Sequence, residues 1–360
     1  MVDYQSKPQI LEHLSKSLTV TIYDCKWIPS SARFVALGSY PKTTGCLQVY
    51  ELQGSDLKLL KEVEKPSSFK CGSFGASSLA DRQLATGNFS GKLQLWDLED
   101  TKTPLFDVQA HASIVNAIDG CGGQTRGYGP PEIASCGRDG CVRVWDVRQK
   151  DAPVAAFEPS EKDDARDCWC VAFGNSYNDE ERRILAGYDN GDVKMFDLRT
   201  NKVLWEDNLK NGVCGVQFDR KDIQMNKFIA TCLESQFHVF EARTHHPKKG
   251  FTSVMESMTK GTTIWSCRHL PQNRDLFMVC GGDGTLSLYK YRYPDQRKIK
   301  DSNGVETGVA GTVDLLSYKN LSTQPIASLD WSPDKAGLFV CSSFDQCIRV
   351  GICTKLNKVG

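Results

Sequence analysis

Apolar and polar residues alternate in short runs along the chain, which is the pattern of half-buried β-strands rather than of amphipathic helices. One run recurs, with the order apolar, polar, apolar and then, in all but the last copy, an aromatic residue. Its copies are LQVYEL (47–52), LQLWDL (93–98), VRVWDV (142–147), VKMFDL (193–198), FHVFEA (237–242), LSLYKY (286–291) and IRVGIC (348–353). Recurrence of one strand along the whole chain indicates a repeat architecture.

The spacing of the copies identifies the kind of repeat. The aromatic positions Tyr50, Trp96, Trp145, Phe196, Phe240 and Tyr289 are separated by 46, 49, 51, 44 and 49 residues. Each copy follows two further β-rich runs, and the nearer of these closes with Gly, Asn or Asp, which suit a tight turn. With a variable outer strand, each repeat predicts one four-stranded antiparallel blade of a β-propeller.

The sequence therefore predicts an all-β fold: a seven-bladed β-propeller forming a single domain over residues 1–360. The expected blades span about 20–63, 69–108, 114–157, 168–207, 212–255, 263–319 with an insertion at 292–311, and 325–353. The seventh repeat leaves little chain for a fourth strand, whereas residues 9–14 (QILEHL) precede the first repeat without a partner. We expect residues 9–14 to close the ring as the outer strand of the last blade, which removes an unpaired inner edge.

Bulk composition narrows the function classes. The 44 basic and 44 acidic side chains give no charge excess that would recruit nucleic acid or anionic lipid. We expect neither a signal sequence nor a membrane span, because no apolar stretch is long enough. The 15 cysteines include no CxxC pair and mostly fall inside apolar strand patterns, so we expect free, buried thiols in a reducing compartment and no metal site.

The third repeat carries a set of polar residues with a known structural use. These are His111 before the first strand, Ser135 on the second, Asp139 in the turn and Trp145 on the third. In these positions the chain resembles the WD-repeat family, in which such residues form a buried hydrogen-bond chain that locks each blade. The turn residues Asp189, Asp283 and Asp345 have no matching His, so we expect those blades to rely more on packing.

Longer segments carry a narrower resemblance. RDCWCVAFGNSYNDEER (166–182), NGVCGVQFDRKD (211–222) and LSTQPIASLDWSPDK (321–335) are similar to the Monad-type WD-repeat proteins, a group of dynein axonemal assembly factors. That resemblance implies a monomeric cytoplasmic adaptor, also found near the ciliary or basal-body region. It implies protein partners, namely the R2TP and prefoldin-like Hsp90 co-chaperone machinery and axonemal dynein chains, with no small-molecule substrate and no cofactor.

No motif in the sequence predicts catalysis. GxxxxGK[ST], HExxH and GxSxG are all missing from the sequence. An alternative non-enzymatic function is a substrate receptor of a cullin-RING ubiquitin ligase. Some propellers in that role carry Trp-Asp-x-Arg, which WDVR (145–148) matches with Arg148 and FDLR (196–199) approaches with Arg199. Each Arg could equally form a local ion pair with the preceding acidic residue.

Two regions are candidate partner-binding surfaces. Aligning the first strands on their first apolar residue gives one column at the rim of the channel: Tyr23, Lys70, Val115, Trp169, Cys214, Trp265 and Ala327. Its aromatic members suggest a contact patch, with Lys70 and with Arg166 and Asp167 on the same rim, although an aromatic there could also fill a gap between blades. The insertion 292–311 is the second candidate, either through Arg297, Lys298 and Lys300 or as a mobile surface loop.

Overall fold

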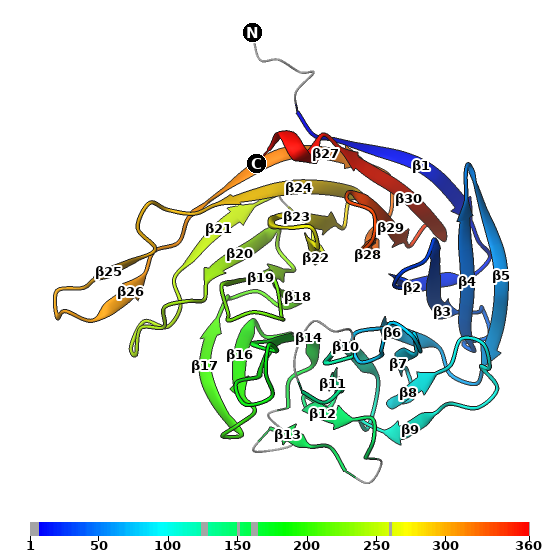
Figure 1. The fold of residues 1–360 in the computed structure, drawn as a ribbon, viewed down its shortest axis with the longest axis horizontal. Coiled ribbons are helices and arrows are strands. Elements are labelled where there is room, and N and C mark those ends of the chain that lie inside the picture. Colours follow the sequence, from blue (N-terminus) through cyan, green and yellow to red (C-terminus); the bar gives the residue numbers. More distant parts are fainter. Residues whose placement is uncertain (1–6, 124–128, 150–151, 160–164, 259–260, 360) are drawn as a thin grey trace.

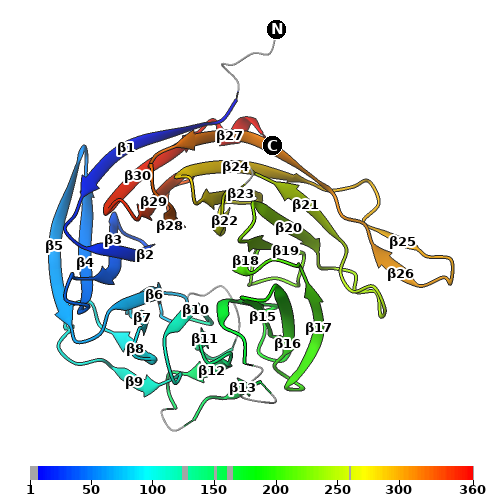
Figure 2. The same cartoon turned by 180° about the vertical axis from the view of Figure 1, so that it is seen from behind.

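The fold is a closed ring of β-sheets. The computed structural model describes residues 7–123, 129–149, 152–159, 165–258 and 261–359. Seven four-stranded antiparallel sheets are arranged radially around a central channel (Figure 1). Figure 2 shows the same ring from behind, with the β1 strand lying along the outside of the last blade. The predicted seven-bladed β-propeller is therefore confirmed. Within the described residues, no helix has the length and apolar character needed to cross a bilayer.

In blades 1 to 6 the strands run outward from the channel in chain order, and blade 7 takes its outermost strand from the N-terminus (Figure 1). Blade 1 comprises β2 (Thr21–Trp27), β3 (Arg33–Ser39), β4 (Gly45–Gln53) and β5 (Asp56–Lys65). Blade 2 comprises β6 (Phe69–Ser73), β7 (Leu84–Asn88), β8 (Lys92–Trp96) and β9 (Phe106–Gln109). Blade 3 comprises β10 (Val115–Cys121), β11 (Glu132–Gly137), β12 (Val142–Asp146) and β13 (Ala155–Phe157). Blade 4 comprises β14 (Cys168–Gly174), β15 (Arg183–Tyr188), β16 (Asp192–Asp197) and β17 (Lys202–Asn208).

The remaining blades differ in how they are completed. Blade 5 comprises β18 (Val213–Phe218), β19 (Lys227–Cys232), β20 (Gln236–Glu241) and β21 (Ser253–Ser257). Blade 6 comprises β22 (Ile264–Leu270), β23 (Asn273–Gly281), β24 (Thr285–Arg292) and β27 (Thr312–Asn320). Blade 7 comprises β28 (Ile326–Trp331), β29 (Leu338–Ser343), β30 (Cys347–Thr354) and the N-terminal β1 (Gln9–Ser17). A short 3-10 helix, η2 (Leu356–Lys358), follows β30.

The N-terminal strand closes the ring as predicted. β1 pairs antiparallel with β30 from Gln9 opposite Thr354 to Ser17 opposite Cys347, so it extends beyond the expected end at residue 14. The Ile10 side chain is only 4% exposed and packs into the core shared by blades 6 and 7. Both ends of the chain thus contribute strands to one sheet.

Burial explains the sequence pattern of the inner strands. Each sheet is covered on both faces by neighbouring blades, so a second strand such as β3 is apolar almost throughout, with Phe34, Val35, Ala36 and Leu37 at 0% exposure. The outer strands alternate instead, because one of their faces meets solvent. The cysteines follow the same logic: all 15 are free, and only Cys214 and Cys347 are half-buried rather than buried.

Polar networks lock the turns of blades 3 and 7. In blade 3, His111 bridges Asp139 through Nδ1 and Ser135 through Nε2, each at 2.9 Å, and Trp145 Nε1 donates to Ser135 Oγ at 3.0 Å. Burial alone would raise the pKa of Asp139, but the interaction with His111 holds this pKa well below its usual range.

Blade 7 has a network of different composition. The Asp345 carboxylate accepts hydrogen bonds from Ser322 Oγ at 2.9 Å and Ser343 Oγ at 2.6 Å, and it pairs with the Arg349 guanidinium. Two serines and an arginine therefore bind the Asp345 carboxylate, which has no matching His. This blade, which we expected to rely on packing, has its own polar lock.

Candidate functional site

A β-bulge recurs at the start of the innermost strand in every blade. In each blade the pairing of the first and second strands skips one residue of the inner strand. The skipped residues are Tyr23, Lys70, Asn116, Trp169, Cys214, Trp265 and Ala327, and all are half-buried. A bulge leaves its residue outside the ladder and redirects the side chain. Seven equivalent bulges therefore place a ring of side chains at one end of the channel, the bulge mouth.

One member of the predicted column was wrong. The sequence alignment placed Val115 in the ring, but Val115 pairs with Gly137 and is fully buried, and Asn116 occupies the bulge. The Asn116 side chain reaches the next blade, where Nδ2 donates to the Cys168 carbonyl at 2.9 Å. The error arose because Ile114 and Val115 are both apolar, so the first apolar residue of that repeat did not mark the first paired residue.

The turns between second and third strands lie at the same mouth. In six blades the residue that opens this turn donates its backbone N–H to a carbonyl just ahead of the inner strand. These residues are Phe89, Arg138, Asp189, Leu233, Gly282 and Phe344. These hydrogen bonds hold the turns beside the bulges. The bulge residues and the turn residues therefore both lie at the mouth.

Aromatic side chains from four blades meet along half of the mouth. Trp265 of blade 6 contacts Phe344 of blade 7 with ring centroids 6.1 Å apart, and Phe344 lies 6.4 Å from Tyr23 of blade 1. Tyr23 in turn lies 5.2 Å from Phe89 of blade 2, and Lys70 Nζ sits 5.2 Å from the Tyr23 ring centroid. We call Trp265, Phe344, Tyr23 and Phe89 the aromatic arc. The structure thus brings together Tyr23, Lys70 and Trp265 from the predicted rim.

The other predicted rim residues lie on a charged part of the mouth. Asp167 forms an ion pair with Arg138 at 3.7 Å and accepts a hydrogen bond from Trp169. Burial raises the pKa of Asp167, while Arg138 and Trp169 oppose this shift. Arg166 beside it is exposed. Trp169 also packs against Gly212 of blade 5, where an added Cβ would come within 2.8 Å of its ring. It therefore fills a gap between blades as well as bordering the mouth.

Phe89 and Phe344 were missed from the sequence. Both follow the second strand of their repeats directly, at the end of GNF (87–89) and SSF (342–344). The signal available was this shared position in the turn, which the alignment of first strands did not include. The remaining candidates lie elsewhere: Arg148 and Arg199 follow the ends of third strands, which run away from the bulge mouth.

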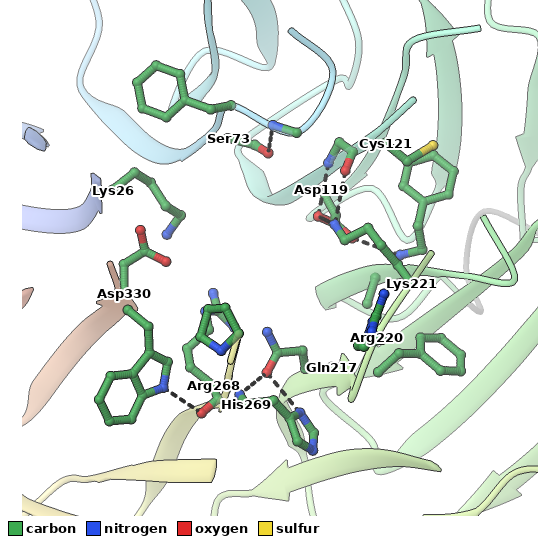
Figure 3. Close-up of a pocket in the computed structure, with 18 of the residues that line it drawn as sticks. Lys26, Ser73, Asp119, Cys121, Gln217, Arg220, Lys221, Arg268, His269 and Asp330 are labelled. Atoms are coloured by element: carbon green, nitrogen blue, oxygen red, sulfur yellow. Dashed lines mark hydrogen bonds and ion pairs between the residues drawn. The ribbon is translucent and has the colours of Figure 1, made fainter. Parts of the chain in front are cut away.

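The opposite mouth holds a cavity of about 330 Å³ lined by charged side chains (Figure 3). Lys221 reaches across from blade 5 to pair with Asp119 of blade 3, and Lys26 Nζ lies 2.5 Å from the Asp24 carboxylate. Asp330 accepts a hydrogen bond from the Trp27 backbone N–H at 2.8 Å. The Lys221–Asp119 and Trp27–Asp330 contacts each join separate blades, whereas Lys26 and Asp24 lie on the same strand, β2. The polar groups of the cavity therefore mainly hold the inner strands together. Nowhere in the described residues do three or more His, Cys, Asp or Glu side chains group as metal ligands.

A pH test follows from the Asp330 carboxyl. Burial raises its pKa from 3.8 to about 6, with Lys26 as the main opposing charge. Because the folded state holds this proton more tightly than the unfolded state, the contribution of Asp330 to stability falls as pH rises from about 4 to 6. As pH rises from about 4 to 6, the free energy of unfolding of the wild type should therefore fall by up to about 3 kcal/mol relative to that of Asp330→Asn.

Chemical denaturation of both proteins at pH 4, 5, 6 and 7 measures this difference. Asn keeps an oxygen that can accept the Trp27 N–H but does not titrate, so the comparison cancels the other carboxylates. A difference between the two proteins that stays constant with pH, or that favours the wild type more strongly at pH 7, would contradict the assignment.

Comparisons with known proteins give related sequences over the full length. The WD domain, G-beta repeat model matches residues 102–146 and 317–350. The chain is 72% identical over 358 residues to dynein axonemal assembly factor 10 of Chlamydomonas reinhardtii, covering 99% of this chain and 100% of the relative. It is 59% identical over 353 residues to the protein of that name in Homo sapiens, covering 98% and 99%. In Dictyostelium discoideum the corresponding identity is 26% over 378 residues, covering 96% of each chain.

Proposed function

The chain belongs to the dynein axonemal assembly factor 10 family of WD-repeat proteins, and on this premise we propose that it is a non-enzymatic adaptor for cytoplasmic pre-assembly of axonemal dynein arms. We propose further that it links dynein chains to the R2TP and prefoldin-like Hsp90 co-chaperone machinery. The relatives' name supports the first part. The second part rests on the resemblance of the sequence to the Monad-type proteins.

The aromatic arc is the observation that carries the adaptor function. Four aromatic side chains from four blades contact one another at an open end of the channel, and each is half-buried. Aromatic side chains give large contact areas at low entropic cost and dominate binding energies at interfaces. Because each is held by a bulge or a turn of a closed ring, a partner meets a surface that needs little ordering on binding.

The ubiquitin-ligase alternative has no comparable support. Arg148 forms an ion pair with Asp146, with Nη2 2.6 Å from the carboxylate, and Arg199 lies 4.0 Å from Asp197. Asp197 also pairs with Arg183 at 2.7 Å. The Trp-Asp-x-Arg pattern thus has a local structural use in this protein, and a ligase contact stays a prediction.

Substitution of the arc tests the proposal. We expect Trp265→Ala and Phe344→Ala each to lower the affinity for a captured dynein heavy chain about 30-fold, since a hot-spot side chain contributes about 2 kcal/mol or more. Affinity purification of the tagged chain from cytoplasmic extract of ciliated cells, followed by quantification of dynein heavy chains and prefoldin-like subunits, measures this loss.

Tyr318→Ala is the matched control, because Tyr318 is 70% exposed on the outer strand of blade 6, away from the mouth. Circular dichroism and thermal melting must show that all three variants are folded. Unchanged recovery of both partner classes with folded arc variants would refute the assignment of the interface, and turnover of a substrate by the purified chain would refute the non-enzymatic function.

A further inference from the structure

The insertion in blade 6 forms a hairpin that projects from the edge of the ring (Figure 1). Its strands are β25 (Lys298–Lys300) and β26 (Glu306–Gly308), paired antiparallel. The hairpin base is closed by a hydrogen bond from Val309 N–H to the Arg297 carbonyl at 2.9 Å. The insertion is therefore a built element with defined pairing rather than an irregular loop.

Arg297 anchors this hairpin to blade 5. Its guanidinium binds the Glu241 carboxylate through Nε at 2.9 Å and through Nη2, which contacts both oxygens, and Nη1 donates to Asn226 Oδ1 at 2.8 Å. The Glu241 side chain is fully buried, and the Arg297 guanidinium also stacks 4.6 Å from the Tyr293 ring centroid. Arg297, a predicted partner contact, is thus already committed to holding the hairpin in place.

The turn between β20 and β21 packs along the hairpin. Thr252 Oγ1 donates to the Gly308 carbonyl at 2.9 Å, and His246 Nε2 lies 3.2 Å from Asp301 Oδ2 near the hairpin tip. Residues 243–250 of this turn and residues 294–309 of the insertion therefore form one body, which we call the basic arm. Its position is fixed by contacts at its base and near its tip.

The exposed side chains of the basic arm have a distinct composition. The exposed basic residues are Arg243, Lys248, Lys249, Lys298 and Lys300, and the exposed acidic residues are Asp295 and Glu306. The whole chain has equal numbers of acidic and basic side chains, so this excess is local. Apolar side chains stand among these charges, with Ile299 at 49% and Val305 at 37% exposure.

We propose that the basic arm is a second docking surface, which binds an acidic protein segment carrying apolar side chains. The positive excess complements the acidic residues, and Ile299 and Val305 offer apolar contacts that a phosphate backbone could not use. The arm projects from the perimeter, whereas the aromatic arc lies along half of the bulge mouth at the channel. Two partners can therefore bind at once, which extends the proposed adaptor function to a second site.

Charge reversal on the arm tests this docking surface. The probe is a fluorescent peptide of alternating Glu and Leu residues, titrated with the full chain and followed by fluorescence anisotropy. We expect the wild type to bind, with affinity that weakens as salt rises, and Lys298→Glu with Lys300→Glu to bind at least about ten-fold more weakly. Ile299→Ser should weaken binding without changing its salt dependence.

Lys202→Glu with Lys210→Glu is the matched control. These lysines are exposed on blade 4, and Lys202 adjoins Val203 and Leu204, which are 48% and 39% exposed. This control should bind the peptide like the wild type, and the arm variants should retain dynein capture through the aromatic arc. No binding by the wild type at about 0.1 M salt, equal loss in the control, or equal affinity for a single-stranded oligonucleotide or anionic vesicles would overturn the proposal.

Discussion

Deletion of residues 1–17 is expected to destabilise the ring by at least about 3 kcal/mol and to drive the chain into oligomers. β1 is the outer partner of β30, and its removal leaves the β30 edge from Cys347 to Thr354 unpaired. The deletion also removes Ile10, which is 4% exposed, and the bond from Lys16 Nζ to the Leu57 carbonyl at 2.9 Å, which ties β1 to blade 1. Light scattering after size exclusion and a thermal melt measure both effects.

Two further samples make this test specific. Deletion of residues 1–6 alone spares β1 and should leave the stability and the oligomeric state unchanged. A synthetic peptide spanning residues 7–19, added to the longer deletion, should restore the melting temperature, because it supplies the missing strand. A truncated chain that melts like the wild type and elutes as one copy would show that β1 does not close the ring.

The ring could be predicted because its signals repeat. The aromatic residues of the third strands recur with nearly constant spacing, since each must fill the same gap between neighbouring blades. Closure of the ring could be predicted by counting strands, because the last repeat lacked a fourth strand and the N-terminal segment contained an unpaired one. Both inferences need only the order of elements along the chain, and the structure confirms both.

The site was harder to predict because its residues are set by register and by distant contacts. Asn116 rather than Val115 lies at the bulge mouth, since a bulge depends on pairing and not on sequence offset. Phe344 was not predicted as a site residue, because residues in turns follow no periodic pattern of apolar positions. Arg297 resembled a free surface charge because its buried partner Glu241 lies 56 residues away. The sequence around Arg297 contains no pattern that indicates a contact with so distant a residue.

Lys227 is another residue whose contacts could not be predicted from the sequence. Its substitution is, after the deletion of residues 1–17, the second change that should strongly lower stability. Its side chain is fully buried, with Nζ 3.1 Å from Asp219, 2.9 Å from Asp275 and 2.6 Å from the Tyr293 hydroxyl. Burial alone would lower the pKa of Lys227, but these partners raise this pKa above its ordinary value, so Lys227 stays a cation. Lys227→Ala should cost about 3–5 kcal/mol, because the Asp219 carboxylate, also fully buried, loses its cation.

Denaturant unfolding measures this cost, and two comparisons isolate its cause. Lys194→Ala removes a lysine that is 31% exposed and pairs loosely with Asp192 at 3.9 Å, so it should cost under about 1 kcal/mol. Lys227→Met combined with Asp219→Leu removes the charges of both fully buried side chains and should recover much of the loss, since the remaining partner carboxylate, Asp275, is 31% exposed. If the double variant is instead as unstable as the sum of its single variants, the damage comes from lost packing, and Lys227 does not act as the counter-charge that joins blades 5 and 6 beneath the basic arm.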